Sequence, residues 1–547
     1  MAKNKIVIFF FFFFSIANSI AQQHTYLVKL KDKSSNTYSV SSPGQFLTAK
    51  AIQRRQKCKV SVDEKDLPVT QTYIDQIAAT GAQVLYPIKW LNGLVVRSDS
   101  TVKAQIASLP FVMSADKNIK SRKASTSATQ ETSSLCETAS ETDYAYTQKD
   151  MLGMIQMATD GYNGSGMLIA ITDNGFLHAD TMSVFSSLFS NGQVLDTWDL
   201  VDLDKTVYGE GSGHGSDVFS ILAGHLPNQM SGPATGAHFL LLRTEDDASE
   251  SPLEELNWVR AAEMADSIGT DILQVSLGYS TFDDPSLNYT QSDLDGNTSY
   301  ISQGATIGAT RGLVIVVSAG NAGNSSWGKI LCPADAIGIL SVGAVDASKQ
   351  RATFSSIGYS ADGRVKPDVM AMGSSTSYVS AGTGAVAYGS GTSFASPLIS
   401  GLAAGLMQAY PTLTHDDLIL SVISSADRYA SPNADYGYGI PNYQEASAYA
   451  RLLVASIYDQ LLTDQGSELV FPNPMTTVLS LKIPLKEVGH VLNWKLYTVT
   501  GALVEEGELL AESVVVNLFS DAAALNKGIY CLTVSYEDHF STFKVIK

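Results

Sequence analysis

Between residues 143 and 452, short apolar runs alternate with helix-like segments. In chain order these are Leu168–Ile171, Val218–Leu222, Phe239–Leu242, the helix-like Trp258–Ile268, Ile272–Leu277 and Leu313–Val317. Strands that are apolar along their whole length are buried on both faces, as happens when helices cover both sides of a parallel sheet. The block is therefore predicted to be an α/β domain with a mostly parallel sheet and helices on both faces.

The rest of the 547-residue chain divides into smaller blocks. Residues 24–118 mix alternating strands with short helices, which predicts a small α+β domain. Its expected strands are Thr25–Leu30, Val84–Ile88 and Leu94–Val96, and its expected helices are Phe46–Lys57, Tyr73–Thr80 and Val102–Leu109. Residues 468–547 show alternating strands between glycine-containing turns, which predicts a β-sandwich. Residues 119–142, rich in Ser, Thr, Glu and Lys, are predicted to be a cleavable linker, and residues 453–467 a second one.

The first residues have the layout of a secretory signal peptide. Lys3 and Lys5 precede an apolar run from Ile6 to Phe14, and small and polar residues follow up to Ala21. A membrane anchor is the alternative, but a bilayer span takes about 20 apolar residues and this run is much shorter. Residues 1–21 are therefore predicted to direct the chain out of the cytoplasm.

Charge and cysteine content narrow the possible partners. The chain has 54 acidic and 36 basic side chains and a formal net charge of -18. An acidic surface repels phosphates, which argues against nucleic acid or an anionic membrane as the main partner. The cysteines, Cys58, Cys136, Cys332 and Cys531, lack the spacing of a metal site. We interpret them as structural, with three pairings left open.

Ser393 lies where a run of small residues meets a helix pattern. The segment reads Gly-Ser-Gly-Thr-Ser-Phe-Ala-Ser-Pro from Gly389 to Pro397, and apolar residues at helical spacing follow it. Pro397 is expected in the first helical turn. A helix N-terminus favours developing negative charge, and the backbone N–H of Ser393 is free to donate there. Ser393 is therefore a candidate nucleophile, with a plain serine N-cap as the alternative.

His214 and Asp173 are candidates for the base and its partner. His214 has a glycine on each side, which allows another backbone or a substrate to approach closely, and a helix is expected directly after it. Asp173 follows the strand Leu168–Ile171, and active sites of parallel sheets gather at the carboxyl ends of the strands. An aspartate there can orient a histidine. A surface or core histidine and an Asx-turn are the alternatives.

Asn321 occupies a similar position after another strand. The strand Leu313–Val317 leads into Ser-Ala-Gly-Asn-Ala-Gly, so the amide of Asn321 is flanked by small residues. A side-chain amide at such a place can donate to an oxyanion. An ordinary turn asparagine is the alternative reading of this residue alone.

The four motifs together resemble those of the subtilisin-like serine proteases, the subtilases. The matching segments are Asp-x-Gly at Asp173, Gly-His-Gly at His214, Ala-Gly-Asn at Asn321 and Gly-Thr-Ser-x-Ala-x-Pro at Ser393. The Gly-Thr-Ser segment is the most specific, and the order Asp, His, Ser is that of subtilisin. The resemblance covers roughly residues 143–452.

The resemblance implies a subtilisin-like fold and a secreted serine endopeptidase that cleaves proteins through an acyl-enzyme. It implies a catalytic triad of Asp173, His214 and Ser393, with Asn321 in the oxyanion hole. It also implies that Ser276, Leu277, Gly278, Ala319 and Gly320 bind the substrate, which pairs with the edge of the sheet as an extended strand. Tyr436–Pro441 resembles the segment that closes such domains.

The chain departs from the family pattern near two of these residues. Asn174 and Phe176 follow the aspartate, and Ser216 and Asp217 follow the His-Gly pair, where other residues are more usual. These changes bear on substrate preference more than on activity. A non-catalytic binding or adhesion protein on a protease scaffold is the alternative function, although it would be expected to lack a triad residue. An ester hydrolase with the same triad is a third.

The flanking blocks carry resemblances of their own. Residues 24–118 resemble inhibitory propeptides of subtilases, so the chain is expected to be a self-inhibited zymogen whose own propeptide is a partner. Residues 468–547 resemble the sorting domain of type IX secretion cargo in Bacteroidetes, through Phe471–Pro474, Leu496–Gly501, Lys527–Tyr530 and Lys544–Lys547. That resemblance implies contact with the type IX secretion machinery and export through the periplasm and outer membrane to the surface or medium.

No cofactor is expected for this chemistry. Subtilases often bind structural calcium, but the sequence has no compact carboxylate loop, and no metal ligands are assigned. Asp293–Asn297 is a possible calcium site and is more simply interpreted as a surface turn.

Overall fold

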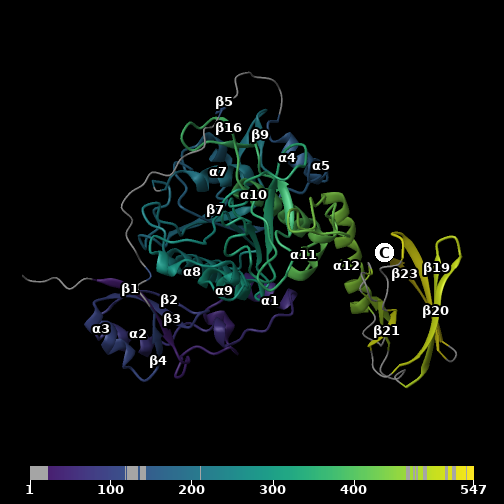
Figure 1. Cartoon of the computed structure of the whole chain (residues 1–547), viewed down its shortest axis with the longest axis horizontal. Helices are drawn as coiled ribbons and strands as arrows, with labels where there is room; N and C mark the ends of the chain where they lie inside the picture. Colours follow the sequence, from purple (N-terminus) through teal and green to yellow (C-terminus); the bar gives the residue numbers. More distant parts are fainter. Residues whose placement is uncertain are drawn as a thin grey trace, which may run out of the picture. The chain divides into compact units, whose positions relative to one another are not determined.

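The structure is a computed structural model, and its chain divides into two compact units, Met1–Arg451 and Leu452–Lys547 (Figure 1). It describes residues 23–116, 119, 134–135, 143–209, 211–462, 468–471, 473, 475, 479–483, 489–511, 515–519, 525–536 and 539–547. The expected signal peptide and most of the expected linker 119–142 lie outside these residues. No described helix is long and apolar enough to cross a membrane.

The predicted parallel sheet is confirmed in the first unit. Seven strands pair in the order β14-β13-β12-β11-β6-β10-β7, and every pair is parallel. In chain order they are β6 Leu168–Asp173, β7 Val194–Asp199, β10 His238–Arg243, β11 Ile272–Val275, β12 Val314–Ser318, β13 Leu340–Val345 and β14 Val369–Met372. β6, with all six residues buried, lies inside the sheet between β11 and β10, because apolar side chains on both faces need cover on both faces.

Helices cover the two faces, as expected. One face, with Leu168, Leu240 and Leu273, shares a core with α8 (Pro252–Ile268) and α9 (Tyr300–Ala309). On the other face, Gln274 hydrogen-bonds to hydroxyls of α10 (Thr392–Ala409). The run Val218–Leu222 is not a strand but part of α7 (His214–Ala223), in agreement with the helix expected after His214. Pro397 is the sixth residue of α10, one turn later than the expected first turn.

The N-terminal domain of the first unit is the predicted α+β domain. Its antiparallel sheet has the order β2-β3-β1-β4. The strands are β1 His24–Leu30, β2 Gln83–Ile88, β3 Gly93–Ser98 and β4 Val112–Ala115, and the helices are α1 Ala49–Lys57, α2 Gln71–Ala78 and α3 Ser100–Ala107. The edge strand β4 was not expected, since its four residues show no alternation. One face of this sheet forms its own core, and the other packs on α8 and α9 (Figure 1).

The remaining elements complete the first unit, and the last helix, α12, continues into the second. The helices are α4 Tyr146–Asp150, α5 Met154–Thr159, α6 Ser186–Ser190, α11 His415–Ser424 and α12 Tyr443–Leu462, and the strands are β5 Ser134–Leu135, β8 His225–Leu226, β9 Met230–Ser231, β15 Thr376–Val379 and β16 Val386–Gly389. The segment Tyr436–Pro441 lies along β14, where Met370 N–H donates to Gly439 O over 2.9 Å. α12 continues to Leu462, so the first part of the expected linker 453–467 is helical.

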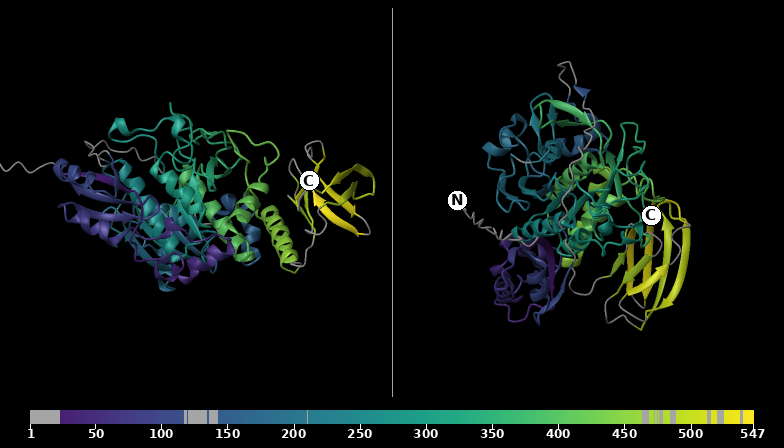
Figure 2. Two further views of the ribbon diagram at one scale, coloured as in Figure 1. Left: turned by 90° about the horizontal axis from the view of Figure 1, so that it is seen from below. Right: turned by 60° about the vertical axis from the view of Figure 1, so that its left-hand side comes forward.

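The second unit contains two antiparallel sheets, yellow in Figure 2, and bears out the predicted all-β fold. The sheets have the orders β17-β18-β21 and β20-β19-β22-β23. The strands are β17 Leu469–Phe471, β18 Leu479–Lys482, β19 Val491–Thr498, β20 Leu503–Leu510, β21 Val515–Phe519, β22 Ile529–Tyr536 and β23 His539–Ile546. Alternate residues from both sheets, such as Leu481, Leu496 and Leu532, form a separate core, as in a sandwich.

Candidate active site

The four motif residues lie where strands end and helices begin. Asp173 is the last residue of β6, and His214 and Ser393 are the first and second residues of α7 and α10. Asn321 follows β12 by three residues. Since β6 and β12 are parallel and both pair with β11, their carboxyl ends open on the same edge of the sheet. This edge is where ligands bind in such folds.

The Asp173 carboxylate holds the ring of His214. The Nδ1–H group of His214 donates to Asp173 over 2.9 Å to Oδ1 and 3.1 Å to Oδ2, and Asn174 N–H donates to Oδ1 over 2.9 Å. Asp173 is 3% exposed. A Cβ on Gly215 would lie 2.2 Å from Gly175 O and 2.9 Å from the Asp173 Cβ. The glycine after His214 is thus required for the close approach of α7 to β6, as expected from the sequence.

Phe394, the residue after Ser393 in α10, packs against the ring of His214 and so places Ser393 near the Asp173–His214 pair. The rings of His214 and Phe394 are stacked, with centroids 6.1 Å apart and planes at 16°. Ser393 is 8% exposed. Its hydroxyl makes no hydrogen bond with the His214 ring among the contacts of the described residues. Such bonds are often long before a substrate is bound and tighten in the complex.

Three carboxylates control the charge of His214. Burial alone would lower the pKa of this ring. The charge and hydrogen bond of Asp173, together with the charges of Asp217 and Asp247, outweigh burial and raise the pKa to about 9. Asp217 lies one turn further along α7 and accepts a hydrogen bond from Ala381 N–H over 2.8 Å. Burial raises the pKa of Asp217 to about 7, although that bond and His214 act against it. From the sequence, Asp217 was identified only as a departure from the family pattern.

The side chain of Asn321 is fixed by Thr392. Its Oδ1 accepts hydrogen bonds from Thr392 N–H and from Thr392 Oγ1, both over 2.9 Å. Because Oδ1 must face these donors, Nδ2 points the other way. A Cβ built on Gly391 would lie 2.8 Å from Ser393 Oγ and 3.6 Å from Asn321 Nδ2, so both groups border the same small space. Sequence reasoning did not identify the role of Thr392.

Ser276 makes a contact that sequence reasoning did not predict. Pro397 has no N–H, so the carbonyl of Ser393 lacks its usual helical donor. Ser276 Oγ–H replaces that donor over 2.9 Å, and Gln274 Nε2 donates to Ser276 Oγ over 2.8 Å. The Ser276 hydroxyl thus anchors the start of α10.

The other four expected substrate-binding residues lie in two neighbouring segments. Leu277 and Gly278 extend β11, and Ala319 and Gly320 extend β12. Ser318 Oγ donates to Leu277 O over 3.5 Å, and Gly320 N–H donates to Thr392 Oγ1 over 3.1 Å. Gly320 therefore contacts the start of α10, where Ser393 lies, and Leu277 lies beside the end of β12.

The N-terminal domain contacts α8 through buried charges. Arg54 and Arg55 of α1 both bind Asp266 of α8, the latter with N–O 2.7 Å, and Lys89 lies 3.8 Å from the same carboxylate. Asp266 is fully buried. Arg311 of the catalytic domain forms an ion pair of 2.7 Å with Asp63 of the N-terminal domain. Beyond this contact, Leu253 N–H at the start of α8 donates to Ile119 O over 3.1 Å.

The described residues hold no cluster of three or more potential metal-binding side chains. In the possible calcium segment, Asp293 accepts from Thr290 N–H over 2.7 Å, and Asp295 accepts from Asn297 N–H over 2.7 Å. Both carboxylates therefore serve local turns. No disulfide joins Cys58, Cys332 and Cys531, and Cys136 lies outside the described residues.

Comparison with known families identifies the chain. Residues 164–440, slightly more than half of it, match the model of the subtilase family. Residues 25–134 match the peptidase S8 propeptide domain of Bacteroidota, and residues 469–547 match the secretion system C-terminal sorting domain. The parallel sheet carrying Asp, His, Asn and Ser at its edge is that of a serine hydrolase. The chain belongs to the subtilase family.

The peptidase region is also similar to individual known proteins. Subtilisin DY of Bacillus licheniformis is 29% identical over 297 residues, which cover 53% of this chain and 94% of that protein. Subtilisin E of Bacillus subtilis (strain 168) is 29% identical over 293 residues, or 53% of this chain and 68% of that protein. The solved structure of the MycP3 protease from the type VII (ESX-3) secretion system covers 58% of this chain and 91% of its own, with 20% identity and a TM-score of 0.45.

These matches establish a serine endopeptidase with a subtilase propeptide and a type IX secretion sorting domain. The sorting domain indicates export to the cell surface or secretion. Subtilases need no cofactor for catalysis. The comparisons give no support to the binding or adhesion protein considered as an alternative.

Proposed function

We propose that Asp173, His214 and Ser393 form the catalytic triad that gives this endopeptidase its activity. The observation that carries the proposal is the bond from His214 Nδ1–H to the buried Asp173 carboxylate, made beside the first turn of α10. That bond leaves Nε2 as the atom of the ring that can take a proton. His214 Nε2 removes the proton of Ser393 Oγ as this oxygen attacks a peptide carbonyl, and the proton passes to the leaving amine. Water then repeats the sequence on the acyl-enzyme.

Asn321 Nδ2 and the backbone N–H of Ser393 stabilise the oxyanion in this proposal. Thr392 holds the amide of Asn321 with two hydrogen bonds, so its NH₂ group needs no reorientation when negative charge develops. The peptide substrate lies as an extended strand along Leu277–Gly278. Ser276 acts by holding the carbonyl of Ser393, rather than by binding substrate with its side chain.

The N-terminal domain keeps the enzyme inactive until it is removed. Its contact with α8 buries Arg54 and Arg55 against Asp266, and Ile119 O accepts a hydrogen bond from Leu253 N–H at the start of α8. The proposed domains are a signal peptide at 1–21, an inhibitory propeptide at 24–118, a processed segment at 119–142, the peptidase at 143–452, and a linker and sorting domain at 453–467 and 468–547. Type IX secretion machinery and protein substrates are the remaining proposed partners.

Hydrolysis of casein by processed protein tests the triad. Ser393→Ala, from which residues 24–118 have been removed by an added protease, is expected to lose about 10⁶-fold in turnover, the loss known for the corresponding serine of subtilisin. Ser390→Ala is the matched control, because this exposed serine lies on the same approach to α10 and its hydroxyl only accepts from Ser375 N–H. Casein hydrolysis by Ser393→Ala at the rate of the control would refute the proposal.

Processing of the same variant tests self-cleavage. The purified Ser393→Ala chain is expected to keep residues 24–118, while the unaltered chain yields a new N-terminus between about residues 119 and 143. Intact-mass analysis measures both outcomes. Normal processing of Ser393→Ala in a purified preparation would show that another protease makes the cut.

A further inference from the structure

The segments after β11 and β12 leave a slot beside Ser393. Val275 pairs with Val317 in neighbouring parallel strands, so residues 276–278 and 318–320 continue side by side. Ser276 contacts Ser393 O, and Gly320 contacts Thr392, so both segments end against the start of α10. If the substrate lies along Leu277–Gly278 as proposed, its side chain next to the carbonyl that Ser393 attacks enters between Gly278 and Gly320.

Leu331 crosses this slot. Its N–H donates to Ala319 O over 3.0 Å, and the next residue, Cys332, exchanges two backbone hydrogen bonds of 2.8 and 3.1 Å with Tyr279. The Leu331 backbone is thus tied to both segments. A Cβ built on Gly320 would lie 2.6 Å from Leu331 Cγ, and one on Gly278 would lie 3.0 Å from Leu331 Cβ and 3.4 Å from Cδ1. The isobutyl group therefore packs directly against both glycines.

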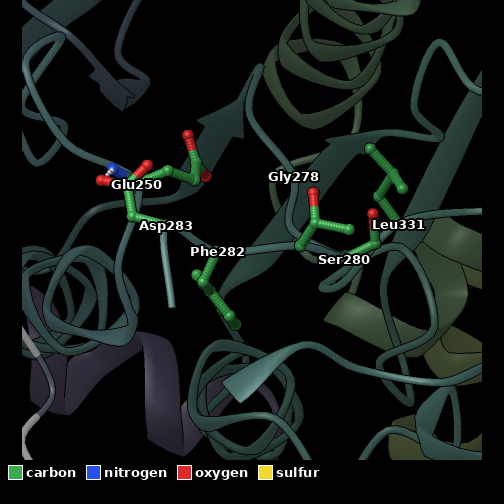
Figure 3. A pocket seen from close by; sticks show the side chains of 7 residues that line it. Glu250, Gly278, Ser280, Phe282, Asp283 and Leu331 are labelled. Carbon is green, nitrogen blue, oxygen red and sulfur yellow. Dashed lines mark hydrogen bonds between the residues drawn. The ribbon is translucent and has the colours of Figure 1, made fainter. Parts of the chain in front are cut away.

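A cavity of about 550 Å³ opens on the outer side of Leu331. Figure 3 shows Leu331 and Ser280 at one end of this cavity, Phe282 between, and Glu250 and Asp283 at the other. Gly320 is not among its lining residues. Leu331, which is half-buried, therefore separates the cavity from the segment that carries Asn321.

We propose that Leu331 limits the substrate side chain before the scissile bond to a small one, so that alanine is preferred over phenylalanine. The inference rests on the proposed triad, because that triad fixes where the cleaved bond lies. A larger side chain must displace the branched end of Leu331, whose backbone is held from two sides. Methylene-sized misfits in an apolar pocket change kcat/KM by about 10- to 200-fold.

Matched peptides that differ only in alanine or phenylalanine before the cleaved bond test this inference. Processed enzyme is expected to favour alanine by about 10- to 200-fold in kcat/KM. Leu331→Gly is expected to reverse the preference, and Leu331→Ala to reduce it. Leu203→Gly is the control: Leu203 is 43% exposed and has φ 62°, where glycine fits well. It should keep the original ratio.

Titration with a fluorophosphonate probe separates the two possible failures. If Leu331→Gly and Leu331→Ala react with the probe at Ser393 but keep the original ratio, Leu331 does not set the preference and the triad stands. If no form of the processed protein reacts or cleaves, the triad fails and this inference with it. A preference for phenylalanine in the unaltered enzyme would also overturn it.

Discussion

The central sheet and the contact between the N-terminal domain and α8 are both buried, but by side chains of opposite character. β6 and its neighbours bury Leu, Ile, Val and Ala, whose packing is non-directional. The contact with α8 buries Arg54, Arg55 and Lys89 around the carboxylate of Asp266, and Arg55 also pairs with buried Asp66. Apolar side chains from the N-terminal domain, among them Trp90, pack beside these charges.

Apolar packing therefore stabilises the peptidase, whereas buried charges contribute to binding its N-terminal domain. An apolar core loses stability gradually when one side chain is shortened. A buried ion pair contributes little against desolvation, yet removing one partner leaves the other charged group buried and uncompensated. A contact built on buried ion pairs therefore suits a domain that is held firmly during folding and released later.

Asp266→Ala should have the largest effect of the changes at this contact. It removes the ion-pair partner of buried Arg54 and one of the two partners of buried Arg55, which costs about 3–5 kcal/mol, a factor of about 10²–10⁴. Cleaved N-terminal domain is expected to dissociate faster by up to that factor. The lag before proteolytic activity appears in the purified full chain measures this release.

Leu241→Ala is the matched control from the sheet, since Leu241 is fully buried in β10. It should lower the free energy of unfolding by about 2–5 kcal/mol and leave the lag unchanged. Equal lags for Asp266→Ala and the unaltered chain would mean that the apolar part of the contact controls release.

Asn321→Ala tests a polar group at the carboxyl edge of the sheet, where polar side chains act in catalysis. Loss of the Nδ2 donor should lower kcat by about 10²–10³-fold with little change in KM, the range known for the corresponding asparagine of subtilisin. Thr392→Ser is the control, because it keeps the N–H and hydroxyl that hold the Asn321 carbonyl. A loss confined to KM would show that Asn321 binds substrate and does not stabilise an oxyanion.

Asp217→Asn, which shifts the pH profile of kcat/KM, should have the smallest effect of these changes. His214 must be neutral to act as a base, so kcat/KM should rise with pH through the raised pKa of this ring, about 9. Asp217→Asn removes a negative charge facing His214, which lowers that pKa and moves the rising limb down by about 0.5–1 pH unit. Asp416→Asn, on the exposed side of α11, is the control. An unshifted limb in Asp217→Asn would exclude Asp217 as a determinant.

The sequence predicted the parallel sheet and the positions of Asp173, His214, Asn321 and Ser393, because these depend on local patterns and on the rule that parallel strands end together. Contacts between distant residues were not predictable. Thr392 holds Asn321, and Leu331 packs on Gly278 and Gly320, only once the chain has folded. The short strand β4 shows no alternation, and the helical run Val218–Leu222 looks the same as a buried strand.

The ion pairs of Asp266 were likewise not predictable from the sequence. Arg54 and Arg55 lie more than two hundred positions before Asp266, and nothing in either segment marks the pairing. The local signal was only a basic helix, which is more often exposed to solvent.

Mass-spectrometric mapping of a fluorophosphonate probe on the processed protein tests the central claim most directly. The probe bonds to a serine that a base and an oxyanion hole activate. We expect labelling at Ser393 in the processed protein and none in Ser393→Ala. Absence of labelling after confirmed removal of residues 24–118 would contradict the proposed triad.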